Sequence, residues 1–262
     1  MLMLTHTLML QERIHAAHIR DIDPDIYIYN IAPDLLTIHP EINARMTHSI
    51  ERFFEIPEQH KRAVYLRYHL LVDDLAHYGE ISLKCTDEFN PDSAGYTYVR
   101  GKHLVETIID LHRLIGKDIS RSEAAYRSHL IIEMIYDLVI RKQIEENKSI
   151  RLLEDAINFT LEKKAQQFCA DMAWLYGIES SKSLDVLKRA AVYMTRERME
   201  RFMNLEGRIS LFTNKFDLRN DNAEFATLIK ALFRDALTCV ENDDFMYQSV
   251  AAIDNCGWVP AN

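Results

Sequence analysis

Glycine and proline are scarce in this chain. It has 7 glycines and 6 prolines in 262 residues, and no proline occurs between Pro91 and Pro260. Because proline breaks helix interiors and glycine weakens them, avoiding both over such a length favours stacked helices. The alternation of apolar and polar residues that strands need hardly appears. The sequence therefore predicts one all-α domain of many helices spanning residues 1–262.

Three other absences exclude whole classes of protein. No apolar run approaches the ~20 residues that a membrane-spanning helix needs. The first ten residues lack a basic leader and a small-residue cleavage site, so no signal peptide is expected. The four cysteines form no Cys-x-x-Cys pair, which is typical of reduced thiols in a cytoplasmic protein. The net charge of −9 disfavours tight binding to nucleic acid or to an anionic membrane.

Glycines and capping residues divide the chain into expected elements. Ser120 and Glu123 form a capping box that opens a helix of about 24 residues, and Asp221 with Glu224 opens another that runs to about residue 240. Helix ends are expected at Gly79, Gly116, Gly177 and Gly207. The other predicted helices are 6–20, 42–54, 58–78, 102–115, 150–176 and 183–205. Residues 21–41 are expected to be irregular, and residues 81–101 to form the longest loop.

Histidine is absent from the second half of the chain. All 11 histidines lie between His6 and His129, and none occurs in residues 130–262. This asymmetry indicates that residues of about 10–140 build a site and that the helices of 150–240 pack around it.

The predicted helix 58–78 carries His69, Asp73 and His77 at positions i, i+4 and i+8. At 3.6 residues per turn these side chains share one face. The helix is apolar nearly all round, which is typical of a buried helix. Burying a carboxylate costs several kcal/mol unless a cation or strong donors satisfy it.

A second helix repeats this pattern. His129, Glu133 and Asp137 again fall at i, i+4 and i+8 within an apolar run. Two such helices facing each other would bring imidazoles and carboxylates into one cavity. Mixed nitrogen and oxygen ligands of this kind suit zinc, and also iron or manganese.

Weaker candidates lie upstream of both helices. Asp34 follows Pro33, whose fixed φ makes the turn stiff, and His48 follows shortly after. His15 and His18 stand at i and i+3 on the first predicted helix, and either is a candidate to reach the same cavity.

In their order along the chain, these residues resemble the zinc-dependent phospholipase C family, which shares its metal site with the S1/P1-type nucleases. The matching features are a helical histidine, an Ala-Pro-Asp turn, a Thr-His pair, His-x-x-x-Asp, a further histidine and His-x-x-x-Glu. In this sequence they correspond to His18, Asp34, His48, His69 with Asp73, His77, and His129 with Glu133. The resemblance covers roughly residues 10–140.

The resemblance implies an all-helical domain that holds two or three zinc ions. Asp34, His48, His69 and Asp73 would hold one ion, and His77, His129 and Glu133 a second. His18 and Asp73 would contribute to a third. The implied activity is hydrolysis of a phosphodiester such as a phospholipid head group, with Asp34 orienting or deprotonating the attacking water. The chain is most similar to an intracellular bacterial branch of the family.

Two features depart from the family pattern. Secreted members begin with a tryptophan that binds the third zinc, whereas here tryptophan occurs only at Trp174 and Trp258. Two ions are therefore expected rather than three. The step from Asp73 to His77 is also shorter than in the secreted enzymes. The loop 81–101, with Phe89, Tyr96, Tyr98 and Arg100, is expected either to select the substrate or to be a plain surface connection.

Four other interpretations remain open. An HD-type metal phosphohydrolase needs an adjacent His-Asp pair, which this sequence lacks. A ferritin-like di-iron bundle needs Glu-x-x-His on two helices, and only Glu12 with His15 fits. The chain could also be a non-catalytic interaction module with a degenerate metal site. Finally, a helical scaffold without a site would use Asp73 and Glu133 as members of buried ion pairs.

Overall fold

The computed structural model describes residues 2–82, 92–218, 221–240 and 245–261, and this part of the chain contains helices and no strand. The all-α class is confirmed. None of the helices in these ranges is both long enough and apolar enough to cross a membrane. The α-helices up to Val139 are α1 (Met3–Ala16), α2 (Asp25–Leu35), α3 (Ala44–His48), α4 (Ala63–Tyr78), α5 (Tyr96–Gly101), α6 (Val105–Arg113) and α7 (Arg121–Val139).

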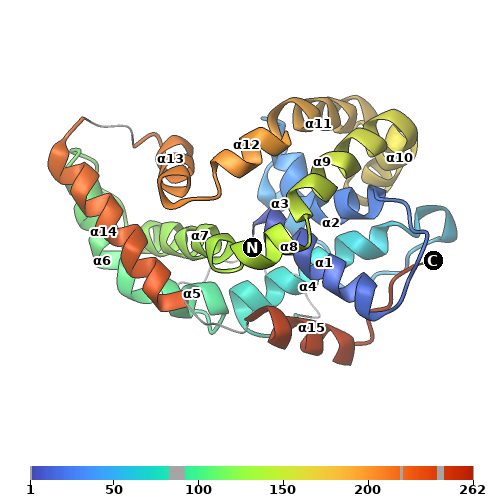
Figure 1. Cartoon of the computed structure of the whole chain (residues 1–262), viewed down its shortest axis with the longest axis horizontal. Coiled ribbons are helices and arrows are strands. Elements are labelled where there is room, and N and C mark those ends of the chain that lie inside the picture. The colour runs from blue at the N-terminus through green and yellow to red at the C-terminus, as the bar shows by residue number, and fades with distance from the viewer. Residues whose placement is uncertain (1, 83–91, 219–220, 241–244, 262) are drawn as a thin grey trace.

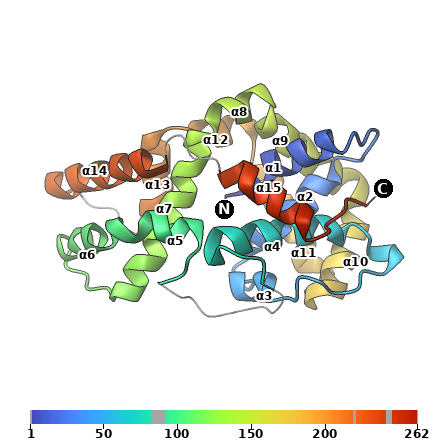
Figure 2. The same cartoon turned by 90° about the horizontal axis from the view of Figure 1, so that it is seen from below.

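The later helices close around these. They are α8 (Arg141–Glu146), α9 (Ser149–Phe159), α10 (Ala165–Tyr176), α11 (Ser180–Tyr193), α12 (Arg196–Arg201), α13 (Leu205–Lys215), α14 (Ala223–Val240) and α15 (Phe245–Asn255). Single turns of other helix types are η1 (Leu36–Ile38), η2 (Glu58–His60), η3 (Lys102–Leu104) and η4 (Thr160–Lys164). Figures 1 and 2 show α6 and α14 at one end of the molecule and α10 and α11 at the other.

Two apolar clusters form the core, and α7 contributes to both. The first cluster is built mainly from α1, α2, α4 and α9–α11, and α7 adds Tyr136 to it. The second is built from α6, α7, α13 and α14, with Ile131, Ile132 and Ile135 from α7. The inner face of α4 packs in the first cluster. Of the two helices that carry the His/acid patterns, α4 therefore belongs to the first cluster and α7 links the first cluster to the second.

Several helix ends follow the local sequence as predicted. The Ser120 hydroxyl accepts a hydrogen bond from the Glu123 backbone N–H at 3.0 Å, so the cap of α7 is confirmed. Gly79, Gly116 and Gly177 have φ values of +80°, +70° and +66°, the left-handed conformation that glycine adopts without strain. The prediction that Gly207 ends a helix is wrong. It lies in the first turn of α13, and its N–H donates to the Asn204 side chain at 2.8 Å.

The other differences from the sequence prediction have local causes. Residues 25–38 are helical rather than irregular, because α2 is buried along almost its whole length and tolerates Pro33 in its last turns. The helix expected at 42–54 shortens to α3, which Asn43 caps. Asn222 rather than Asp221 caps α14. The helix expected at 183–205 is α11 followed by α12, and sequence reasoning missed α13 and α15.

The expected loop 81–101 is only partly described. Residues 83–91, which include Phe89, lie outside the described ranges, and α5 begins at Tyr96. Gly95 leaves no room for a side chain, since a Cβ there would lie 2.1 Å from the carbonyl carbon of His77. Because the Gly95 backbone packs directly on the His77 backbone, the start of α5 lies against the last turn of α4.

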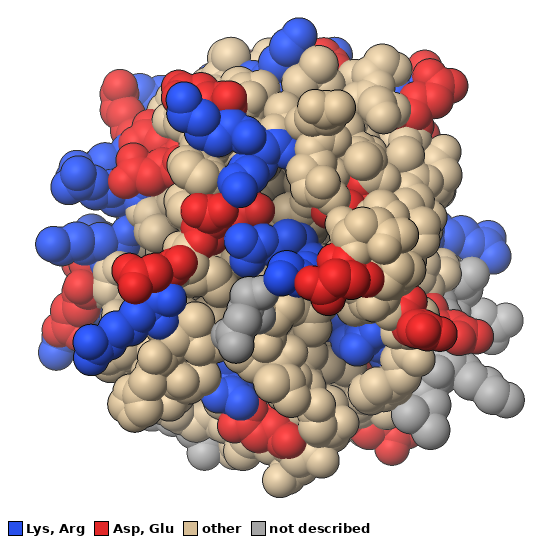
Figure 3. Space-filling view, turned by 90° about the vertical axis from the view of Figure 1, so that its right-hand side faces the viewer, with Lys and Arg blue, Asp and Glu red and all other residues tan. Residues whose placement is uncertain are grey.

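The surface carries charges of both signs. On the face in Figure 3, lysine and arginine side chains alternate with aspartate and glutamate, and neither sign forms a continuous field.

Candidate metal centre

Helix α4 places His69, Asp73 and His77 in a line that runs from the core to the surface. His69 is fully buried and the Asp73 side chain is 6 % exposed, whereas the His77 side chain is 23 % exposed. No glycine or proline interrupts the helix between Ala63 and Tyr78, and Gly79 ends it. The i, i+4, i+8 spacing is therefore preserved as one continuous face.

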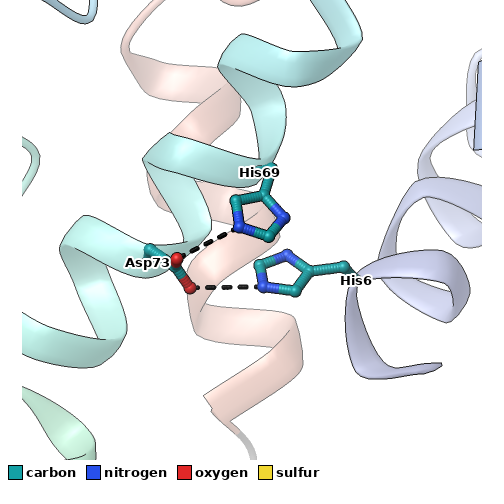
Figure 4. A group of neighbouring side chains, drawn as sticks. All are labelled: His6, His69 and Asp73. Carbon is teal, nitrogen blue, oxygen red and sulfur yellow. Dashed lines mark ion pairs between the residues drawn. The ribbon is translucent and has the colours of Figure 1, made fainter. Parts of the chain in front are cut away.

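Histidine 6, from α1, completes the innermost part of the site. Its ring stacks on that of His69, with centroids 3.7 Å apart and planes 18° from parallel. One Asp73 oxygen lies 3.2 Å from His6 Nε2 and the other lies 3.2 Å from His69 Nε2 (Figure 4). Both imidazoles are fully buried.

The stacked imidazoles are poorly satisfied by protein groups. Among the described residues, no ring nitrogen of His6 or His69 has a partner in hydrogen-bond geometry. Nearly all buried polar atoms in proteins have such a partner, and leaving one unmade costs roughly 1–3 kcal/mol. A cation bound between the two imidazoles and the Asp73 carboxylate would give these ring nitrogens a partner.

Aspartate 34 and His48 extend the cluster toward solvent. Asp34 lies in the last turn of α2 and His48 ends α3. His48 Nε2 lies 3.5 Å from an Asp34 oxygen and 3.4 Å from an Asp73 oxygen. The side chains of Asp34 and His48 are 27 % and 25 % exposed, so they form an open rim above a buried floor. Asp34, His48 and His69 offer ligand atoms that all lie within 4.8 Å of one another.

A further group joins α4 to α7. His77 Nε2 lies 2.8 Å from a Glu133 oxygen, and the rings of His77 and His129 meet edge to face with centroids 5.4 Å apart. The ligand atoms of these three residues also lie within 4.8 Å of one another. Together with the residues above they form what we call the histidine-rich centre: His6, Asp34, His48, His69, Asp73, His77, His129 and Glu133.

The protonation states of the centre suit metal ligands. Burial, with the neighbouring His69, lowers the pKa of His6 to about 4, and burial lowers that of His129 to about 3. Both rings are therefore neutral at pH 7 and keep a lone pair for a metal. Burial alone would raise the pKa of Asp73, but nearby positive charges, those of His69 and His6 among them, and a hydrogen bond from His48 hold that pKa well below the usual range. The carboxylate is therefore ionised.

Histidine 48 behaves in the opposite way. Burial would lower its pKa, but hydrogen bonds to Asp34 and Asp73 raise the pKa to about 10. In the metal-free protein His48 therefore carries the proton that balances the two carboxylates. A metal binding there would displace this proton, so affinity should increase with pH.

The spacing of the ligand atoms matches a zinc coordination sphere. Nitrogen and oxygen ligands lie about 2.0–2.1 Å from zinc, which places the corners of a tetrahedron about 3.3 Å apart. The separations of 3.2, 3.2 and 3.4 Å around Asp73, and of 3.5 Å between His48 and Asp34, are of this size. The donor set of imidazoles and carboxylates is also one that zinc prefers. The residues present therefore fit the metal that the sequence resemblance implies.

Aromatic side chains surround the outer part of the centre. Tyr98 stacks on His129 with centroids 4.8 Å apart, and Tyr126 meets the same ring edge to face. Burial raises the pKa of Tyr126, and the charges of Glu133 and Asp34 raise it further. Tyr126 therefore lies near both carboxylates while remaining 39 % exposed. Behind Tyr98 is a cavity of about 190 Å³, whose walls include Lys102, Arg121 and Ser128.

Seven of the eight residues that the sequence singled out as ligands lie in these groups, and His18 is the exception. Asp34, His48, His69 and Asp73 form one group, and His77, His129 and Glu133 form the other. Helix α1 ends at Ala16, and His18 follows it with a φ of +53°, exposed to solvent. His15 is also exposed. Sequence reasoning missed His6, which fills the place expected for His18. His6 could have been recognised because it lies within a run of buried residues of α1, as His69 does on α4.

Replacing His6 should therefore affect metal binding, whereas replacing His18 should not. We expect His6→Gln to lose one equivalent of metal, because the substitution removes a buried ligand that faces Asp73. His18→Gln should keep the full complement, since its side chain is exposed beyond the end of α1. Elemental analysis of the two proteins, purified side by side, checks this prediction. Equal metal content in both variants would contradict it.

Comparison with known proteins identifies no relative of this chain. No family model, no curated protein and no solved structure matches it.

Proposed function

We propose that this protein is a metal-dependent phosphoesterase with two or three zinc ions, of the kind found in the phospholipase C family. One observation supports this most strongly: two stacked, fully buried imidazoles face a buried carboxylate at 3.2 Å, and among the described residues none of their ring nitrogens has a partner in hydrogen-bond geometry. A purely structural histidine pair would be expected to make hydrogen bonds. The resemblance in the order of the residues along the chain leads to the same class of site.

The ligands are assigned as follows. Asp34, His48, His69 and Asp73 would hold one ion, His77, His129 and Glu133 a second, and His6 with Asp73 a third. Bound zinc would supply a Lewis acid for a phosphoryl oxygen and would lower the pKa of water at the site.

The chain's own residues suggest how substrate and water are oriented. The floor of the centre, formed by His6, His69 and Asp73, is closed to solvent, so substrate would approach from the rim of Asp34, His48 and His77. Asp34 is ionised, since the hydrogen bond from His48 and the charges of His48 and His69 outweigh burial and lower its pKa. Its partly exposed carboxylate would accept a hydrogen bond from the attacking water and take its proton.

The surroundings suggest a phosphodiester as substrate. Tyr126 presents a partly exposed ring beside the rim, which would contact an apolar or planar part of the substrate. The cavity behind Tyr98 is lined by Lys102, Arg121 and Asp92, and Arg121 pairs with Glu106. Lys102 is therefore the side chain there that would favour a substrate with negative charge. A phospholipid head group has both properties.

The test begins with metal analysis of freshly purified, untagged protein to which no metal has been added. We expect at least two equivalents of zinc, iron or manganese, and hydrolysis of bis(p-nitrophenyl) phosphate and of dispersed phosphatidylcholine. Chelation should abolish turnover, and added zinc should restore it. Stoichiometric metal without turnover would instead favour a non-catalytic module. Absence of stoichiometric metal, unchanged after reconstitution, would contradict the site itself.

A further inference from the structure

A separate cluster of possible ligands lies outside the histidine-rich centre. His103, on η3, faces Asp235 and Cys239, which stand one turn apart on α14. His103 Nε2 lies 3.2 Å from the Cys239 sulfur and 3.2 Å from an Asp235 oxygen. We call these three residues the outer site. It shares no residue with the centre described above.

One ring nitrogen of His103, Nε2, faces both the Cys239 thiol and the Asp235 carboxylate. All three ligand atoms lie within 4.8 Å of one another. Around a tetrahedral zinc ion, nitrogen and oxygen ligands would be about 3.3 Å apart and nitrogen and sulfur about 3.6 Å apart. The outer site therefore needs only small adjustments to coordinate an ion.

We propose that the outer site binds a single divalent transition-metal ion, with zinc the best match to its donors. A thiolate sulfur, an imidazole nitrogen and a carboxylate oxygen are the ligand types that zinc uses in proteins. The side chains of His103 and Asp235 are 41 % and 55 % exposed, so an ion reaches them directly from solvent. Three protein ligands leave the fourth position to water.

The location of the outer site suggests what the ion does. η3 joins α5 to α6, and α5 carries Tyr98, which stacks on His129. Cys239 stands in the last turn of α14. An ion at the outer site would link these segments and stabilise the folded state by mass action. Binding would also release the thiol proton, so affinity should increase with pH.

Cobalt(II) provides a direct test, because cobalt–thiolate bonds give charge-transfer absorption in the near ultraviolet. The full-length protein is stripped of metal, kept reduced and titrated with Co²⁺, with Cys239→Ser and His103→Ala in parallel. We expect the band in the wild type and its loss in Cys239→Ser. Zinc stoichiometry should fall by one equivalent in that variant. His103→Ala should weaken cobalt binding at least about 10-fold, as expected for removal of a direct ligand.

Cys256→Ser serves as the matched control. Cys256 is also half-buried, but its sulfur contacts the Ile253 carbonyl oxygen instead of a histidine and a carboxylate. This variant should keep both the band and the full stoichiometry. The proposal is overturned if the wild type shows no band, or if Cys239→Ser keeps the band. Melting curves of all the metal-free variants verify that they are folded. Because the readout is spectroscopic, the result does not depend on phosphoesterase activity.

Discussion

Replacing Asp73 by Asn should remove metal from the histidine-rich centre and reduce phosphodiester hydrolysis at least about 100-fold. Loss of a residue that only supports a ligand already costs about 10- to 100-fold in metal affinity or activity, and Asp73 is itself a proposed ligand. Its two oxygens lie within 3.2–3.4 Å of His6, His48 and His69. Asn keeps the size of the side chain but removes the charge that binds the cation. Elemental analysis and turnover of bis(p-nitrophenyl) phosphate measure the effect.

The neighbouring residue offers a matched control. Asp74 is buried, as Asp73 is, but it pairs with Arg52, at 3.0 and 2.7 Å between the paired nitrogens and oxygens. Breaking a buried ion pair by removing one partner costs about 3–5 kcal/mol. Asp74→Asn should therefore lower the melting temperature strongly while keeping the metal. If Asp73→Asn lost stability but kept its metal, as expected for Asp74→Asn, Asp73 would be a structural residue and the assigned centre would be wrong.

The fold class could be predicted because it depends on local rules that act along the whole chain. Scarce glycine and proline permit long helices, and Ser120 marks a helix start through its own hydrogen bond. The errors occur where tertiary burial overrides these local signals. Pro33 argues against a helix, yet the residues before it in α2 are buried, and their packing compensates for the lost backbone hydrogen bond.

In the candidate site, too, some features follow from the local sequence and others depend on tertiary packing. The spacing of His69, Asp73 and His77 on one helix is visible in the sequence because helix geometry is fixed. The choice between His6 and His18 depends on where α1 ends and which of its faces packs against α4. Asp137 follows the same spacing on α7, yet it pairs with Arg208 and Thr5. Those partners lie 71 and 132 residues away, a distance that no local pattern encodes.

The metal-free protein should unfold in mild acid, because two buried histidines resist protonation. The pKa values of His6 and His129 are about 4 and 3 in the folded state, against 6.5 ordinarily. The unfolded chain therefore binds more protons than the folded one below pH 6.5. The stability that these residues contribute is complete above pH 6.5 and is lost as pH falls toward 3. For His129 this amounts to about 5 kcal/mol, comparable with the total stability of many domains.

Histidine 48 gives the opposite pH dependence on the alkaline side. Its folded pKa of about 10 lies above 6.5, so its contribution is complete below pH 6.5 and is lost as pH rises toward 10. The stability that His6 and His129 contribute is lost in acid, and the stability that His48 contributes is lost in base. The metal-free protein should therefore be most stable near pH 6.5. Bound metal competes with protons for the same nitrogens, so in the loaded protein acid unfolding should coincide with metal release.

Thermal melting of the chelated protein across pH 3–10 measures both sides of this profile. His129→Gln, which cannot be protonated in this range, should flatten the acid side. His18→Gln removes an exposed histidine and should leave the profile unchanged. If His129→Gln kept the full acid sensitivity of the wild type, His129 would not be held neutral by burial. The ring would then lack the lone pair that a metal needs, and the assignment of His77, His129 and Glu133 to one ion would lose its electrostatic basis.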